Sequence, residues 1–140
     1  MRPLFVDSSV LLIAVGGELP WRESCRAVLA AASRGEVRLH MSVEGGQEFL
    51  FHRMRKTDLA SAVAQFDLVD ALVVWHAFDV ETMRRARDLV AQGVALGRDA
   101  VHAATALTAG FDAIVSCDRD FDGIPGLARI NPADLAGPLP

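Results

Sequence analysis

The chain has 140 residues, of which 51% are hydrophobic and 23% are charged, and 14 basic against 18 acidic residues give a net charge of −4. This composition is typical of a globular protein, here one domain over residues 1–140, and excludes a disordered chain. The acidic balance argues against a general nucleic-acid coat, which needs positive charge to bind phosphates, but it does not exclude a local nucleic-acid site.

The first half of the chain alternates short apolar runs with longer stretches of helical periodicity. Continuous apolar runs bounded by polar residues predict buried strands, whereas apolar residues three or four positions apart predict helices. Ser42 is a good N-cap for the helix that follows it. In chain order we predict a strand at 4–6, helices at 10–15 and 20–33, a strand at 37–41, and helices at 43–56 and 58–68.

The second half continues this alternation. We predict a strand at 71–75, helices at 80–91 and 98–109, strands at 113–116 and 128–130, and a loose tail over 131–140. Strands that alternate with helices of ten or more residues predict an α/β fold with a parallel sheet. Because the strands are apolar throughout, we expect helices to cover both faces of that sheet.

The two cysteines, Cys25 and Cys117, form neither a disulfide framework nor a zinc-binding pattern, which favours a reducing compartment. Asp7 interrupts the apolar start of the chain, so we expect no signal peptide. No run approaches the roughly 18 apolar residues that a membrane helix needs. We therefore expect a cytoplasmic protein that does not enter a membrane.

Parallel sheets bind ligands beyond the carboxyl ends of their strands, and several carboxylates of this chain are predicted to lie there. Asp7 follows the first predicted strand, Asp118 follows the last clear one, and Asp99, like the pair Glu44 and Glu48, lies near the start of a helix. Clustered carboxylates repel one another unless a cation compensates, and Mg²⁺ and Mn²⁺ prefer oxygen ligands. The pattern therefore indicates a divalent-metal site suited to phosphodiester hydrolysis.

Each acid also has an ordinary structural interpretation. Asp7, Asp99 and Glu44 suit a helix N-terminus, where an aspartate caps the chain or an anion interacts with the helix dipole. Glu48 lies one turn further on and shares a face with Glu44, which is unfavourable for like charges. The Gly45-Gly46 pair weakens this helix by about 1 kcal/mol per glycine. A metal ligand at Glu48 would explain why such a segment is tolerated.

Four segments in a fixed order across nearly the whole chain indicate the function more specifically than the single acids do. They are residues 5–9 (FVDSS), 47–49 (QEF), 98–106 (RDAVHAATA) and 116–121 (SCDRDF), the last extended by 124–127 (IPGL) and 130–132 (INP). Together they resemble the PIN-domain ribonucleases, and among these the VapC-type toxins of bacterial toxin–antitoxin pairs.

The resemblance implies a Rossmann-like α/β/α sandwich with a central, mostly parallel sheet. It implies Mg²⁺- or Mn²⁺-dependent endonucleolytic cleavage of RNA, often tRNA or ribosomal RNA. It also implies homodimers, and inhibition by a VapB-like antitoxin whose C-terminal tail reaches the active site. It places the metal-binding and catalytic roles on four acids and accessory roles on two further residues, namely Asp7, Glu48, Asp99 and Asp118, with Ser9 and Asp120. Glu44 stays a second candidate for the glutamate role.

The densest basic run, residues 52–56, supplies candidate RNA contacts in Arg53, Arg55 and Lys56. Cations near a helix C-terminus are also common for purely structural reasons. The helix predicted at 58–68, together with Trp21, offers an apolar surface for a dimer or an antitoxin, although each of these residues also fits an ordinary core.

Other functions fit the sequence less well. A serine hydrolase built on Ser8 or Ser9 with His102 lacks the Gly-x-Ser-x-Gly elbow, and we interpret His102 as a residue on a helix face. A phosphatase with an aspartyl nucleophile would need a second acid two residues after the first, where this chain has Ser9. A nucleotide-binding module lacks a glycine-rich phosphate loop. The remaining alternative is a PIN-like fold that binds a partner without catalysis, against which the four intact acids argue.

Overall fold

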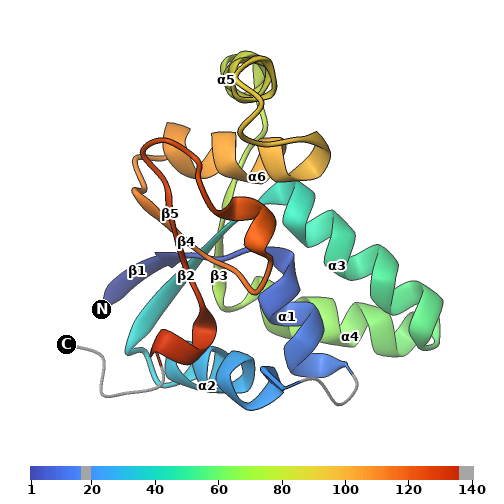
Figure 1. Cartoon of the computed structure of the whole chain (residues 1–140). Coiled ribbons are helices and arrows are strands. Elements are labelled where there is room, and N and C mark those ends of the chain that lie inside the picture. The colour runs from blue at the N-terminus through green and yellow to red at the C-terminus, as the bar shows by residue number, and fades with distance from the viewer. Residues whose placement is uncertain (17–19, 136–140) are drawn as a thin grey trace.

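The structure is a computed structural model that describes residues 1–16 and 20–135, and its strands and helices follow one another in the order that the sequence predicts (Figure 1). The strands are β1 (Arg2–Phe5), β2 (Val37–Ser42), β3 (Val73–His76), β4 (Ala113–Val115) and β5 (Ala128–Ile130). The helices are α1 (Ser8–Val15), α2 (Arg22–Ser33), α3 (Val43–Lys56), α4 (Leu59–Asp70), α5 (Val80–Ala91) and α6 (Gly97–Thr108). The predicted bounds agree with these to within about two residues, as expected at frayed element ends.

The named strands all pair in parallel. Strand β2 lies between β1 and β3, while β4 pairs with β5. A parallel bridge between Val6 and Val115, reinforced by the Asp7 amide donating to the Val115 carbonyl at 3.0 Å, joins the two groups. The resulting order is β3-β2-β1-β4-β5, which confirms the predicted parallel sheet and places the carboxyl ends of β1 and β4 side by side.

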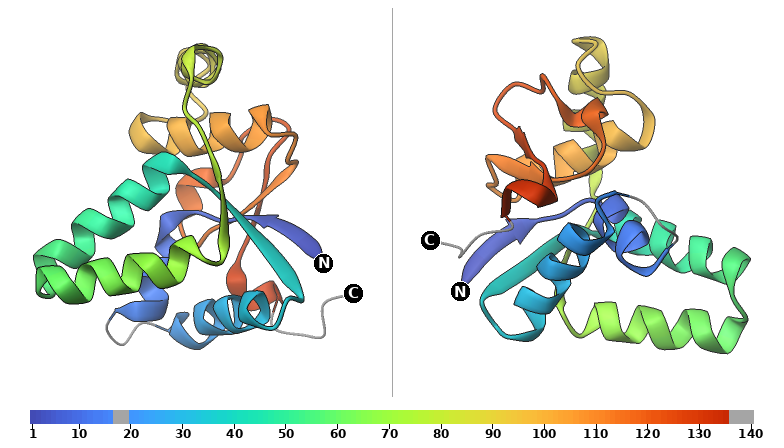
Figure 2. Two further views of the ribbon diagram at one scale, coloured as in Figure 1. Left: turned by 180° about the vertical axis from the view of Figure 1, so that it is seen from behind. Right: turned by 60° about the horizontal axis from the view of Figure 1, so that its bottom comes forward.

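Helices cover both faces of this sheet, which confirms the α/β/α architecture (Figures 1 and 2). Successive strand residues point to opposite faces, so Leu4 and Val6 belong to one core cluster and Phe5 to the other. Helices α1 and α2 pack on the first face, α6 covers the second, and α5 packs against α6. Among the described residues, none of the helices combines the length and the apolar character that crossing a membrane requires.

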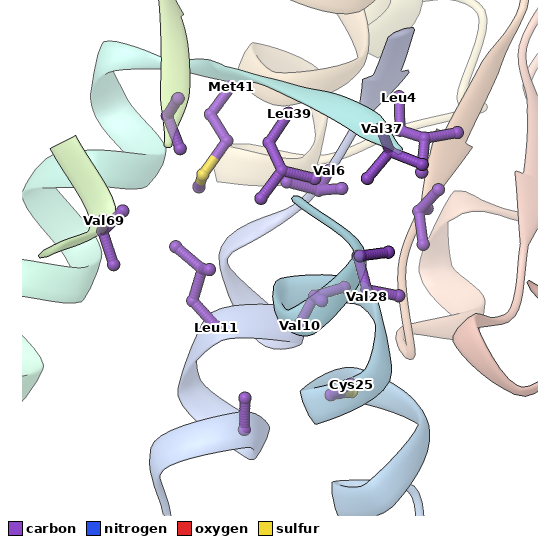
Figure 3. Close-up of a cluster of buried hydrophobic side chains, with 14 of the residues drawn as sticks. Leu4, Val6, Val10, Leu11, Cys25, Val28, Val37, Leu39, Met41 and Val69 are labelled. Atoms are coloured by element: carbon purple, nitrogen blue, oxygen red, sulfur yellow. The ribbon is translucent and has the colours of Figure 1, made fainter. Parts of the chain in front are cut away.

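The first core cluster shows why α1 and α2 lie where they do (Figure 3). The β2 side chains Val37, Leu39 and Met41 are almost fully buried. Leu39 and Met41 lie over Val10 and Leu11 of α1, and Val37 lies on the side of Val28 of α2 (Figure 3). Burying side chains of this size stabilises the fold by about 1.5–3 kcal/mol each. This packing fixes the start of α1, and therefore the position of Asp7 immediately before it.

Helices α3 and α4 form an antiparallel pair that projects beyond the sheet edge (Figures 1 and 2). Ser42 caps α3 as predicted, because its hydroxyl accepts a hydrogen bond from the Gly45 amide at 3.0 Å. The structure gives the glycines of α3 a packing role: a Cβ on Gly46 would lie 2.7 Å from the Trp75 ring of β3. Close contact between α3 and β3 thus requires glycine there, independently of any metal ligand.

The tail is more ordered than predicted. Residues Pro132–Leu135 form the short 3₁₀ helix η2, in which Pro132 is buried and Leu135 packs against the first core cluster. The prediction of a loose tail is therefore wrong for this segment, because it gains apolar contacts that its sequence alone does not reveal. Residues 136–140 lie outside the described part of the chain.

Candidate functional site

Three carboxylates meet at the carboxyl end of the sheet. Asp99, in the first turn of α6, and Asp118 and Asp120, at the start of the 3₁₀ helix η1 (Arg119–Phe121), each offer an oxygen within 4.8 Å of the others. Asp118 also caps η1, since its Oδ1 accepts the Asp120 amide at 2.8 Å. The cap and the cluster are therefore compatible, and one local turn presents two of the three acids.

Asp7 lies beside this cluster without being part of the three-residue set. It is 7% exposed and caps α1 by accepting the Ser9 amide, so its structural interpretation holds. The buried Ser116 hydroxyl donates to Asp7 at 2.9 Å and accepts the Asp118 amide at 3.0 Å. Ser116 thus ties the two strand-end acids together, a role that the sequence did not reveal.

Ser9 braces the same loop from α1. Its hydroxyl accepts the Cys117 amide at 3.3 Å and lies 3.4 Å from the Ser116 hydroxyl. The predicted accessory residue is therefore part of the scaffold that joins the end of β1 to the loop after β4.

Glu48 reaches the site from the second turn of α3. Its Oε2 accepts the Ser8 hydroxyl at 3.2 Å, and its Oε1 accepts His102 Nε2 at 2.5 Å. Glu44 lies one turn earlier and lines the same pocket as Glu48, but within the described part of the chain no hydrogen bond joins it to this network. Of the two glutamates, Glu48 is the one held in place by groups on α1 and α6.

Sequence reasoning placed His102 on a helix face and gave it no part in the site. In the structure it is 3% exposed, and its Nδ1 lies 2.8 Å from the Ser42 hydroxyl. Because an ionised carboxylate only accepts hydrogen bonds, the Nε2 that faces Glu48 carries the proton. The spacing from Asp99 to His102, three residues on one helix, is the signal that could have placed this histidine beside the acids.

Charge and burial act on these groups in opposite directions. Burial raises the pKa of Glu48, but the hydrogen bonds from His102 and Ser8 and the charges of His102 and Arg98 outweigh it, so its pKa lies below its ordinary value. Burial lowers the pKa of His102, but its hydrogen bond to Glu48 and the charges of Asp7, Glu48 and Asp99 raise it overall. The pair is thus held as carboxylate and proton donor.

The pKa of Asp99 is raised by its position in the acidic cluster. Burial, followed by the charges of Asp118, Asp7 and Asp120, raises its pKa from 3.8 to about 6. A divalent cation would compensate the repulsion between these ionised carboxylates. Three nearby carboxylates are the hard oxygen donors that Mg²⁺ and Mn²⁺ prefer. The donor set and its mutual repulsion therefore fit a divalent metal ion.

The raised pKa predicts how the metal-free protein responds to pH. The folded state holds the Asp99 proton more tightly than the unfolded state, so this group lowers stability as pH rises from about 4 to about 6. We expect Asp99→Asn to unfold at a higher temperature than the unmodified protein in EDTA, by a margin that grows over this pH range. Thermal melts followed by circular dichroism measure it, and a margin independent of pH would contradict the assignment.

The three predicted basic contacts do not share one environment. Arg53 is buried, and its guanidinium donates to Gln65 of α4 at 2.8 Å, so it joins α3 to α4. Arg55 and Lys56 are exposed. Arg55 lines a pocket of about 180 Å³ next to Glu48, which also includes Gln47, Phe51, Val101 and Arg98. Arg98 is a basic group at the site that sequence reasoning missed.

The comparisons agree with this architecture. The family model described as "PIN domain" matches residues 4–127. Ribonuclease VapC7 of Mycobacterium tuberculosis is 31% identical over 137 residues, 96% of this chain and 94% of that protein. Among solved structures, VapBC2 from Rickettsia felis, bound to a promoter DNA fragment, covers 93% of this chain and 98% of its own with a TM-score of 0.72 and 15% identity. The sarcin-ricin-loop-cleaving toxin VapC20 of Mycobacterium tuberculosis has a TM-score of 0.69 at 15% identity and covers 89% of this chain and 98% of its own.

Proposed function

Because the chain belongs to the PIN domain family, we propose that it is a metal-dependent endoribonuclease and the toxin of a toxin–antitoxin pair. The observation that carries this proposal is the group of three carboxylates at the carboxyl end of a parallel sheet, with Asp7 close enough to raise the pKa of Asp99. Glu48 is linked to the same region through its hydrogen bonds to Ser8 and His102. The ribonuclease names of its relatives support the reaction class. A tRNA or a ribosomal RNA is the expected substrate, and the structural relative that cleaves the sarcin-ricin loop supports the latter.

In this proposal Asp99, Asp118 and Asp120 would hold the metal ion, and Asp7 would bind the same ion or a second one. Bound Mg²⁺ or Mn²⁺ would supply a Lewis acid that stabilises charge on the phosphate and lowers the pKa of water. Asp7 and Asp118 keep their positions through Ser116, whose hydroxyl contacts both residues. The acids are therefore arranged before any ligand arrives, so little reorganisation is needed.

Glu48 would orient the attacking water or would hold the metal ion through a water molecule. Its two oxygens already accept hydrogen bonds from Ser8 and His102, so its carboxylate plane is fixed. His102 in turn is fixed by Ser42, the residue that caps α3. We assign His102 a positioning role: it holds Glu48 as an ionised carboxylate in a fixed orientation.

Removing the metal provides the direct test of this function. We expect EDTA to abolish RNA cleavage and Mg²⁺ or Mn²⁺ to restore it, because without a cation the carboxylates repel the phosphate. Water as the nucleophile predicts products with 5′-phosphate and 3′-hydroxyl ends, which end-specific labelling distinguishes. Cleavage that persists in EDTA, or 2′,3′-cyclic phosphate ends, would contradict the mechanism. Absence of any metal-dependent cleavage would leave the partner-binding alternative.

Arg55 and Arg98 flank the pocket beside Glu48 and are proposed to contact RNA phosphates, with Lys56 as a further exposed contact. Each lost phosphate contact lowers the slope of log affinity against log salt by about 1. We therefore expect Arg55→Ala with Arg98→Ala to weaken RNA binding and to reduce that slope by about 2. Fluorescence anisotropy on an inactive variant measures both quantities.

Arg34→Ala is the matched control for this experiment. Arg34 is exposed and pairs with Glu36 just before β2, at the opposite end of that strand from the acidic cluster. It removes one positive charge without touching the pocket, as Arg55→Ala or Arg98→Ala alone does at the pocket, and it is compared with these single variants. An equal loss of affinity and slope in Arg34→Ala would show that net charge, and not the pocket, governs RNA binding.

We also propose a VapB-like antitoxin as partner, which the VapBC complexes among the structural relatives support. A homodimer in the cytoplasm completes this proposal. An apolar groove of about 390 Å³ between α3, α4 and β3, lined in part by Phe66 and Trp75, supports a protein partner on this side. Co-expression with a small neighbouring open reading frame, followed by size-exclusion chromatography, tests both the complex and the dimer.

A further inference from the structure

We propose that Cys25 and Cys117 are a peroxide-reactive thiol pair that closes into a reversible disulfide beside the acidic cluster. They are the two cysteines of the chain and lie 92 positions apart, yet their sulfur atoms are 3.6 Å from each other. Cys25 belongs to α2, and Cys117 belongs to the loop between β4 and η1, directly before Asp118. The fold therefore brings together two thiols that no local pattern relates.

The surroundings of the two thiols assign them different roles. Cys25 is fully buried in the core cluster that contains Val10 and Val28 (Figure 3). Cys117 is partly exposed, so it is the thiol that a small oxidant reaches first. This combination of an accessible thiol and a buried thiol in contact with it is the arrangement of a peroxide-sensing pair, in which the buried one resolves the oxidised one.

The chemistry balances with a peroxide as the oxidant. Cys117 loses its proton and attacks hydrogen peroxide as the thiolate, the O–O bond breaks, and Cys117 becomes a sulfenic acid while the expelled hydroxide takes up the proton as one water. Cys25 then attacks the Cys117 sulfur, its proton leaves with the hydroxyl as a second water, and the S–S bond forms. Two thiols lose two electrons, the peroxide gains them, and an external dithiol reverses the reaction.

Closing the disulfide would disturb the acidic cluster. An S–S bond is about 2.05 Å long, so the 3.6 Å contact must shorten by about 1.5 Å. Cys25 is locked in the core, so the loop that carries Cys117 takes up the movement. That loop holds Asp118 and is braced by the Cys117 amide donating to Ser9. We therefore expect Asp118 to move relative to Asp99 and Asp120, which weakens metal binding; this consequence rests on the proposed function, whereas the disulfide does not.

The experiment uses the full chain, reduced and then treated with hydrogen peroxide in stoichiometric amounts. We expect intact-mass spectrometry to show the loss of two hydrogens, and non-reducing peptide mapping to recover one Cys25–Cys117 peptide. Calorimetric titration with Mn²⁺ alone should give an affinity about tenfold weaker after oxidation, restored by dithiothreitol. Metal binding does not depend on finding the RNA substrate, so this test is independent of the cleavage assay.

Cys25→Ser is the matched control, because it removes the resolving thiol and leaves Cys117 in place. Under the same peroxide it should gain oxygen instead of losing hydrogen, and it should not form the bridged peptide. Failure of the unmodified protein to form the disulfide would overturn the proposal. A disulfide that forms without changing Mn²⁺ affinity would overturn the coupling to the site, while reduced protein that fails to bind Mn²⁺ would count against the proposed metal-dependent function instead.

Discussion

Asp99→Asn is expected to lower RNA cleavage by at least about a thousandfold, or roughly 4 kcal/mol of transition-state stabilisation, while the chain stays folded. The change replaces one carboxylate oxygen by an amide in the tight set with Asp118 and Asp120. It keeps the size of the side chain and removes the negative charge of Asp99. Burial and repulsion raise the pKa of this carboxyl to about 6. Loss of activity together with equal or higher stability therefore indicates a metal-binding acid. Replacing an acid with a structural role would lower both the activity and the stability.

Asp67→Asn is the matched control, since Asp67 is exposed on α4. It should cleave RNA at the normal rate. Circular dichroism and thermal melts in EDTA show whether each variant is folded, and a titration with Mn²⁺ shows whether binding is lost. Full activity in Asp99→Asn would remove this residue from the proposed metal set. Equal losses in both variants would point to net charge as the cause.

Much of the fold could be predicted because its signals are local. The apolar runs at residues 37–41 and 113–116 became β2 and β4, and Ser42 became the N-cap of α3. In a parallel sheet the chain order of strands and helices also predicts where strand ends gather. Asp7 and Asp118 could be placed at one edge for this reason, before any distance was known.

The features that could not be predicted depend on contacts between segments far apart in the sequence, which no local pattern encodes. The Ser116 hydroxyl that joins Asp7 to Asp118 depends on β1 and β4 being neighbours through Val6 and Val115. The glycine at position 46 follows from the Trp75 ring of β3 pressing on α3. In both cases the residue type is explained only by a partner tens of residues away.

His102 is the site residue that local reasoning placed least well, and its contacts define a strong test. We expect His102→Leu to lower the cleavage rate by about 10- to 100-fold, the usual effect of losing a group that orients a functional carboxylate. His102→Gln keeps a donor amide for Glu48 and should recover part of the rate. The change should appear in kcat more than in KM, because Glu48 is proposed to act on the attacking water.

A double-mutant cycle separates positioning from simple packing. If His102 acts through Glu48, then His102→Leu should change the rate by no more than about twofold once Glu48→Gln is present, because the group that it positions is already lost. Thr105→Val is the packing control: Thr105 is 2% exposed on the same helix, and its hydroxyl contacts only the Val101 carbonyl among the described residues. Independent, multiplicative effects of the two changes would instead place His102 in the core alone, since the 2.5 Å contact between its Nε2 and Glu48 would then carry no catalytic consequence.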